Sequence, residues 1–310
     1  MRKTFVDTMT EISRKDPNVL LIIGDTGFSV FEEYEEEFKD RFINVGIAEQ
    51  NFVGFSAGLA AMGMRPFAYN VVSFMTLRAM EQILLDVCYQ ENPVVLVGVG
   101  GGLAYGNAGP THHSCQDIAM MRTLPNMTVI CPGDPYEMRS AILKSYELNK
   151  PVYIRIGRSV DPKVHENDIY NQFKIGKAIK LRDGEDVAIF STGCMLKETV
   201  RVCEILESMG VKAAHYSMHT VKPLDNETIL QCADKYKGIY TIEEHSAIGG
   251  LGGAVSELLA QSDYANLIFK IFGFPDMFAP VTGSREYLLE LYKMDPESIA
   301  KRILESLKQG

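Results

Sequence analysis

Short, almost wholly apolar runs recur along the chain, and they limit its possible folds more than any other feature. In the first half they are Val19–Ile23, Pro66–Val72, Val94–Val99, Met127–Ile130 and Val152–Ile156. Strands of this kind are buried on both faces, which is typical of parallel sheets covered by helices. Segments with helical periodicity alternate with these runs, at Ala48–Met62, Thr76–Tyr89, Gln116–Thr123 and Pro135–Leu148. The alternation predicts an α/β domain.

The same alternation restarts in the second half of the chain, after a polar stretch that contains Pro162. Strands are expected at Val187–Ser191, Val211–Tyr216, Gly238–Glu243 and Leu267–Phe272. Helices are expected at Met195–Met209, Gly252–Ala260 and Ser298–Leu307. We therefore predict two doubly wound α/β domains with mainly parallel sheets, over residues 1–160 and 181–310. Residues 161–180 are predicted to be the linker between them.

Charge and composition exclude several classes of partner. The formal net charge is −9, which argues against binding to nucleic acid or to an anionic membrane, because both need a basic surface. A small anionic substrate stays possible, since its pocket needs only a few cations. No apolar run is long enough to span a membrane, and Met1–Thr10 lacks the apolar core of a secretory signal. The six cysteines form no CxxC pair, so we expect reduced thiols and a cytoplasmic location.

A first ligand-binding motif lies between Arg41 and Gly63. An expected strand, Phe42–Val45, runs through Gly46 into a helix that contains Glu49. Ligands of α/β proteins bind at the carboxyl ends of such strands. On the residues alone, Glu49 could equally be an acidic residue that favours the start of a helix.

The string RFINVGIAEQN in this motif resembles the cofactor-binding signature of the transketolase family, which includes deoxyxylulose-phosphate synthase. The resemblance implies thiamine diphosphate as the cofactor, with Glu49 at a ring nitrogen of its aminopyrimidine and Ile47 close to it. A carboxyl group there assists proton removal from the reactive thiazolium carbon. Glu49 is thus predicted to be both catalytic and cofactor-binding, while the cofactor supplies the carbanion chemistry.

The string FMTLRAMEQI resembles the stretch of the same family in which an aromatic ring stacks on the pyrimidine. Phe74 falls at the stacking position, and Arg78 and Gln82 follow on the next helix. All three are predicted to bind the cofactor. An aromatic ring suits a flat heteroaromatic ligand in a dry pocket, although an isolated Phe is more often an ordinary core residue.

The glycine-rich stretch GGGLAYGNAGPTHHSCQD resembles the transketolase loop that precedes a helix at the active site. His112 matches a family histidine near the substrate oxygens, so it is predicted to be catalytic and substrate-binding through proton transfer. Gly100 and Asn107 stand where the family usually has a histidine and an acidic residue that contact substrate, which suggests a changed sugar. The alternative is that His112 and His113 merely cap the following helix.

The end of the strand Val152–Ile156 leads to Arg158, which matches a family arginine that binds the substrate phosphate. Arginine suits bidentate recognition of phosphate or sulfonate. The alternative is an ordinary solvated arginine at the end of a strand. Ser29 is a weaker candidate for substrate contact. The run Glu243–His245 does not predict a metal site, because adjacent strand residues point to opposite faces.

The resemblance covers the pyrimidine-binding and C-terminal domains of the family and leaves out its diphosphate-binding domain. That domain carries a G-D-G motif and Asn residues that bind magnesium, and Gly24–Thr26 has no matching Asn pair. We therefore expect a partner N-terminal subunit to hold most of the diphosphate and the Mg²⁺. No metal ligand is assigned in this chain, and an assembly with two copies of each subunit is expected.

Together these motifs predict the C-terminal subunit of a split transketolase. It would transfer a two-carbon ketol unit from a ketose phosphate, or a modified anionic ketose, to an aldose phosphate. One alternative is the β subunit of a 2-oxo acid dehydrogenase, which shares the architecture. The other is a non-catalytic subunit that retains the fold.

Overall fold

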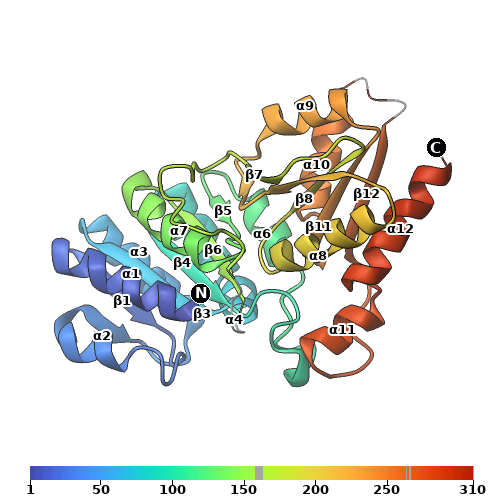
Figure 1. The fold of residues 1–310 in the computed structure, drawn as a ribbon. Coiled ribbons are helices and arrows are strands. Elements are labelled where there is room, and N and C mark those ends of the chain that lie inside the picture. The colour runs from blue at the N-terminus through green and yellow to red at the C-terminus, as the bar shows by residue number, and fades with distance from the viewer. Residues whose placement is uncertain (158–162, 263, 265–266, 310) are drawn as a thin grey trace.

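The computed structural model describes residues 1–157, 163–262, 264 and 267–309. The described residues form a seven-stranded sheet and a five-stranded sheet. Figure 1 shows the blue-to-green first half of the chain beside the yellow-to-red second half, each with helices packed around its own sheet. The prediction of two α/β units with mainly parallel sheets is confirmed.

The first sheet has the strand order β10-β5-β6-β4-β3-β1-β2. Its strands are β1 (Val19–Ile23), β2 (Phe42–Asn44), β3 (Arg65–Val71), β4 (Val95–Val99), β5 (Thr128–Ile130), β6 (Val152–Ile156) and β10 (Thr220–Lys222). All neighbours pair in parallel except β10, which pairs antiparallel with β5. Because β10 lies far along the sequence, the second half of the chain contributes an edge strand to the first sheet.

Alternate side chains of these strands enter two different cores, as the two-residue period of a strand requires. Leu21 and Tyr69 face one core, while Ile22 and Ala68 face the other. The helices of this half are α1 (Arg2–Lys15), α2 (Glu32–Glu37), α3 (Glu49–Ala61), α4 (Val72–Arg78), α5 (Met80–Gln82), α6 (Asp117–Thr123) and α7 (Pro135–Leu148). The first core is covered by α1 and α7, and the second by α3, α4 and α6.

The second sheet has the order β12-β11-β8-β9-β7. Its strands are β7 (Ile179–Arg182), β8 (Val187–Ser191), β9 (Ala213–Ser217), β11 (Gly238–Ser246) and β12 (Ile268–Phe274). The remaining helices are α8 (Met195–Ser208), α9 (Asn226–Lys235), α10 (Leu251–Leu259), α11 (Arg285–Leu291) and α12 (Pro296–Gln309). One face packs against α8 and α12, and the other against α9 and α10.

Several elements differ from the sequence-based expectation. The single helix predicted over Thr76–Tyr89 is three pieces, α4, α5 and the π-helical segment η2 (Ile83–Tyr89). Helices α1, α2, α9 and α11 were not predicted, and β7 begins inside the expected linker. Two 3₁₀ turns, η1 (Lys39–Arg41) and η3 (Gly106–Ala108), complete the elements. In the part of the chain that the structure describes, we find no helix with the length and apolar character needed to cross a membrane.

Candidate functional site

Glu49 lies at the first residue of α3, just after the loop that leaves β2. Its side chain is buried, and its Oε1 accepts a hydrogen bond of 2.7 Å from Nη1 of Arg78 at the end of α4. The positive end of the α3 dipole also favours a carboxylate here. Glu49 and Arg78 line an open depression together with Ala48, Gln50 and Asn51. The carboxylate thus stands at the edge of a space that a ligand can enter.

Phe74 and His112 continue the row that Glu49 and Arg78 begin. The Arg78 guanidinium lies 4.4 Å from the centroid of the Phe74 ring. The Phe74 and His112 rings are 5.0 Å apart at an interplanar angle of 67°. Four residues predicted from three separate motifs therefore lie side by side, on α3, on α4 and in the loop after β4.

His112 belongs to the loop that joins β4 to α6. Its Nδ1 is 2.9 Å from Oγ1 of Thr111, and the neighbouring His113 is buried with its Nε2 donating to the carbonyl of Gly106. Within the described residues, the hydrogen bonds of His112 Nδ1 and His113 Nε2 stay inside the loop, and the first-turn N–H of Ala119 in α6 donates to Nε2 of His245. These bonds do not support the alternative that the two histidines cap α6. His112 is instead half-buried beside Phe74.

Gly100 has a backbone φ of +88°, a conformation that side chains rarely adopt. A Cβ atom placed there would lie 2.0 Å from Cε2 of Tyr105. The Tyr105 ring thus fills the space that a side chain at residue 100 would need, and its centroid lies 5.8 Å from that of His112. Sequence reasoning missed Tyr105, although it is the single aromatic residue between Gly100 and Thr111.

Other predicted residues lie apart from this row. Ile47 is 75% exposed in the loop before α3, and Asn107 is exposed on the turn η3. Ser29 is exposed after β1, where its N–H donates to Oε1 of Glu32. Arg158 lies outside the described residues, so its predicted role has no structural account.

Gln82, at the end of α5, has a buried Oε1 atom without a hydrogen-bond partner among the described residues. A buried acceptor of this kind costs free energy unless a donor reaches it. A flat heteroaromatic ligand with N–H donors is chemically complementary to Phe74, Glu49 and Gln82. Its ring could stack on Phe74, and its donors could bond to the Glu49 carboxylate and to this amide oxygen. The described residues contain no group of three or more His, Cys, Asp or Glu that could hold a metal, so nothing here is assigned to magnesium.

The glycine-rich loop is anchored by buried charges from both halves of the chain. Arg155, on β6, donates from Nε to Asp117 at 2.7 Å and from Nη2 to the carbonyls of Ser114 and Glu244. Arg155 and Asp117 are 3% and 2% exposed. This arginine is therefore a structural residue of the junction between the two sheets.

The run Glu243–His245 on β11 makes hydrogen bonds to other segments of the chain. Glu243 accepts from the first backbone N–H groups of α10, and Glu244 accepts from the N–H of Leu103 in the glycine-rich loop. Glu244 also pairs with Arg285 at 2.7 Å. Each of the three residues thus ties a different segment to the second sheet.

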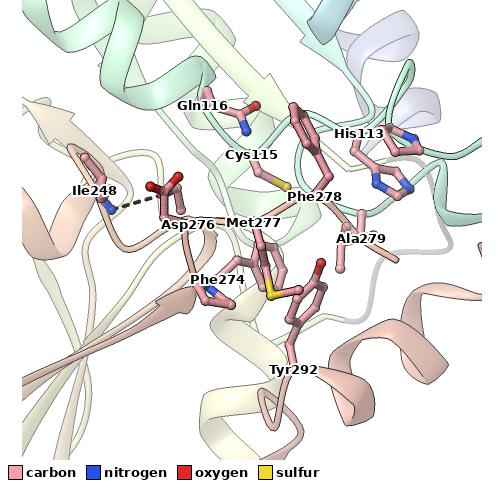
Figure 2. A pocket seen from close by; sticks show the side chains of 14 residues that line it. His113, Cys115, Gln116, Ile248, Phe274, Asp276, Met277, Phe278, Ala279 and Tyr292 are labelled. Atoms are coloured by element: carbon pink, nitrogen blue, oxygen red, sulfur yellow. Dashed lines mark hydrogen bonds between the residues drawn. The ribbon is translucent and has the colours of Figure 1, made fainter. Parts of the chain in front are cut away.

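A pocket of about 340 Å³ lies between the glycine-rich loop and the second half of the chain. Figure 2 shows Met277, Phe278 and Tyr292 gathered around the same space as Cys115, with His113 close by. Burial raises the pKa of the Cys115 thiol to about 12, so this thiol is not a nucleophile at neutral pH. The pocket is mostly apolar and adjoins the loop that carries His112.

A second buried polar cluster joins α7 to the segment around His165 and to β9. Glu137 accepts hydrogen bonds from Nε2 of His165 and from Oγ of Ser217. Burial lowers the pKa of His215 to about 3 and that of His219 to about 4, so both imidazoles are neutral near pH 7. Burial also lowers the pKa of His165, but the Glu137 carboxylate outweighs it and raises the pKa above its usual value.

The family model described as the transketolase pyrimidine binding domain matches residues 1–162, and the transketolase C-terminal domain model matches residues 176–299. A putative transketolase C-terminal section from Methanocaldococcus jannaschii is 39% identical over 100% of this chain and 96% of its own length. A subunit of an apulose-4-phosphate transketolase from Phocaeicola vulgatus is 37% identical over 99% of this chain and 97% of its own.

A third relative, a subunit of a 6-deoxy-6-sulfo-D-fructose transketolase from a Clostridium species, is 36% identical over 97% of this chain and 92% of its own. Among solved structures, a split gene transketolase described as an inactive β4 tetramer superposes with a TM-score of 0.90. It is 33% identical, and the match covers 99% of this chain and 98% of that one.

Proposed function

The chain belongs to the transketolase family, and we propose that it is the C-terminal subunit of a split transketolase dependent on thiamine diphosphate. It would transfer a two-carbon ketol unit from a ketose phosphate, or a related anionic ketose, to an aldose phosphate. The observation that carries this proposal is the row of Glu49, Arg78, Phe74 and His112, which three distant motifs bring to one edge of the first sheet.

Each residue of the row has a proposed task. Bound thiamine diphosphate supplies the carbanion chemistry of ketol transfer. Glu49 would hold and exchange a proton at the pyrimidine ring nitrogen, and Phe74 would stack on the ring. His112 would move a proton at the substrate oxygens. Gln82 would accept a hydrogen bond with its buried oxygen, and Ile47 would complete the wall of the cofactor site.

The substrate is proposed to be a sugar with an anionic end. Arg158 would bind a phosphate or sulfonate, with Ser29 as a second contact. Two relatives are named for transfer from an apulose phosphate and from a sulfonated fructose, which supports a donor other than the common pentose phosphates. Gly100 and Asn107, which replace the usual polar side chains, support the same proposal.

The N-terminal partner subunit is proposed to hold the diphosphate and Mg²⁺, in an assembly with two copies of each subunit. Relatives named as one subunit of a transketolase and as a C-terminal section support a partner. We also propose domain limits of 1–160 and 181–310 with a linker over 161–180. The cytoplasmic location stays a prediction from the cysteines.

The proposal is tested by mixing this chain with candidate N-terminal subunits, thiamine diphosphate and Mg²⁺. Transfer from a panel of ketose donors to glyceraldehyde 3-phosphate is then measured, with each subunit alone as a control. Activity only in the mixture is the expected result. Oxidative decarboxylation of pyruvate or branched oxo acids, without ketol transfer, would favour the dehydrogenase alternative. A mixture that binds the cofactor but catalyses neither reaction would favour a non-catalytic subunit.

A further inference from the structure

The loop between β4 and α6 (Figure 1) leaves no room for a side chain at residue 100. A Cβ atom on Gly100 would lie 2.0 Å and 2.4 Å from two ring carbons of Tyr105. Contacts this short do not occur between real atoms, so a side chain at residue 100 would force the Tyr105 ring out of its position. Tyr105 therefore replaces whatever residue 100 would otherwise present at this place.

The position of Tyr105 is set by a well-anchored loop. On one side, the N–H of Gly100 donates to the carbonyl of Ile156 at 2.9 Å. On the other side, Gly106 packs directly on Gly283, where even an added Cβ would lie 2.4 Å from the carbonyl oxygen. Held between these contacts, the ring packs on the first core and lies 5.8 Å from His112.

The phenol of Tyr105 differs chemically from the histidine that the family resemblance implies at residue 100. Tyr105 is half-buried, and its ring packs on the first core while it lies beside His112. A phenol is neutral near pH 7, and it both donates and accepts a hydrogen bond. An imidazole at the same place would carry a positive charge in part of its population near pH 7. A neutral donor and acceptor suits a sugar hydroxyl better than a doubly charged phosphate.

We infer that Tyr105 is a specificity-determining residue that contacts a hydroxyl of the sugar chain next to His112. This inference rests on the proposed function, since it names a further contact of the same site. The substrates that it selects are polyhydroxylated ketoses whose chain hydroxyl, and not their anionic end, lies against the phenol. A site that hydrogen-bonds a substrate hydroxyl discriminates strongly against the analogue that lacks it.

The experiment compares Tyr105→Phe with the unmodified chain in the reconstituted two-subunit complex. We would measure kcat/KM for an accepted ketose donor and for its analogues that each lack one chain hydroxyl. Tyr105→Phe removes only the phenol oxygen. It should lower kcat/KM for the full donor at least about tenfold and leave one deoxy analogue unchanged. Equal losses for every donor, or no loss for any, would overturn the inference.

Tyr236→Phe is the matched control, because its hydroxyl contacts the carbonyl of Gly184 in the second half of the chain. It should leave the ratios of kcat/KM between the full donor and its deoxy analogues unchanged.

A double-mutant cycle followed by thermal unfolding tests whether Tyr105 occupies the space of a side chain at residue 100. Gly100→Ala should lower the melting temperature much less in a Tyr105→Gly background than in the unmodified chain.

The two failures are distinguishable. A complex without ketol transfer refutes the proposed function, and the specificity inference falls with it. If the complex is active but Tyr105→Phe leaves the ratios of kcat/KM between donors unchanged, the inference is refuted and the proposed function is not. Equal melting losses from Gly100→Ala in both backgrounds would show that Tyr105 does not fill the space of residue 100, and would also refute it.

Discussion

Arg78 and Glu49 form an ion pair of 2.7 Å between the end of one helix and the start of another. The carboxylate side is 7% exposed, whereas the guanidinium side is 51% exposed. Solvent screens the half-exposed guanidinium, whereas the buried carboxylate needs a partner to offset its desolvation. A ligand that replaces Arg78 at the carboxylate must therefore supply a hydrogen-bond donor of its own, while Arg78 can keep its contact with the Phe74 ring.

Glu49→Gln is expected to abolish most ketol transfer in the reconstituted complex. The amide keeps the shape of the side chain but cannot hold or exchange the proton, so kcat should fall about 100-fold or more. The melting temperature should change little, because the amide oxygen can still accept the hydrogen bond from Arg78. Glu36→Gln, an exposed change on α2, is the control. Near-normal activity of Glu49→Gln would rule out the catalytic role.

Phe74→Leu is expected to weaken binding of thiamine diphosphate about threefold to tenfold, since an aromatic pair contributes about 0.5–1.5 kcal/mol beyond burial. Titration of the reconstituted complex with the cofactor measures the effect. Phe269→Leu, at a half-buried site on β12, should leave the affinity unchanged. Identical cofactor affinity of both variants would show that Phe74 is only a packing residue.

Arg155→Met is expected to lower the free energy of unfolding by about 3–5 kcal/mol, because it leaves the Asp117 carboxylate buried without its cation. Denaturant unfolding of the chain measures the loss. Arg14→Met, which breaks an exposed pair with Glu37, should cost at most about 1 kcal/mol. Comparable losses from the two variants would mean that the buried pair stabilises no more than a surface pair.

Acid is expected to destabilise the chain below about pH 6.5, the usual pKa of histidine. The folded state holds the pKa of His215 at about 3 and that of His219 at about 4. The unfolded state therefore binds more protons as the pH falls. At pH 5 each of these two histidines should lower the free energy of unfolding by about 2 kcal/mol. The raised pKa of His165 acts in the opposite direction, since its contribution is lost as the pH rises.

Urea unfolding between pH 7.5 and 5 measures this dependence. In His215→Asn the slope of stability against pH should be smaller by up to about 1.4 kcal/mol per pH unit. An unchanged slope in this variant would show that His215 is not the group that titrates.

The sequence alone was enough to predict most strands and several helices, because apolar periodicity is a local property. Val19–Ile23 and Val152–Ile156 were predicted with the bounds that the structure has. The motifs around Glu49, Phe74 and His112 also identified the candidate site, since a family signature is a short string with few alternatives. Short segments such as Thr220–Lys222 were missed, because three residues carry too little pattern to mark a strand.

Tertiary structure alone decided which of these residues meet and what surrounds them. The ion pair of Glu49 with Arg78 and the buried pair of Arg155 with Asp117 join segments that are distant in the sequence. The filling of the space at Gly100 by Tyr105 depends on how one loop folds back on itself. No local pattern encodes such contacts, because they depend on how β3, β4 and β6 align at one edge of the sheet and on how the second sheet closes against the loop. The sequence determined the elements and the residue types of the site, and only their packing determined its geometry.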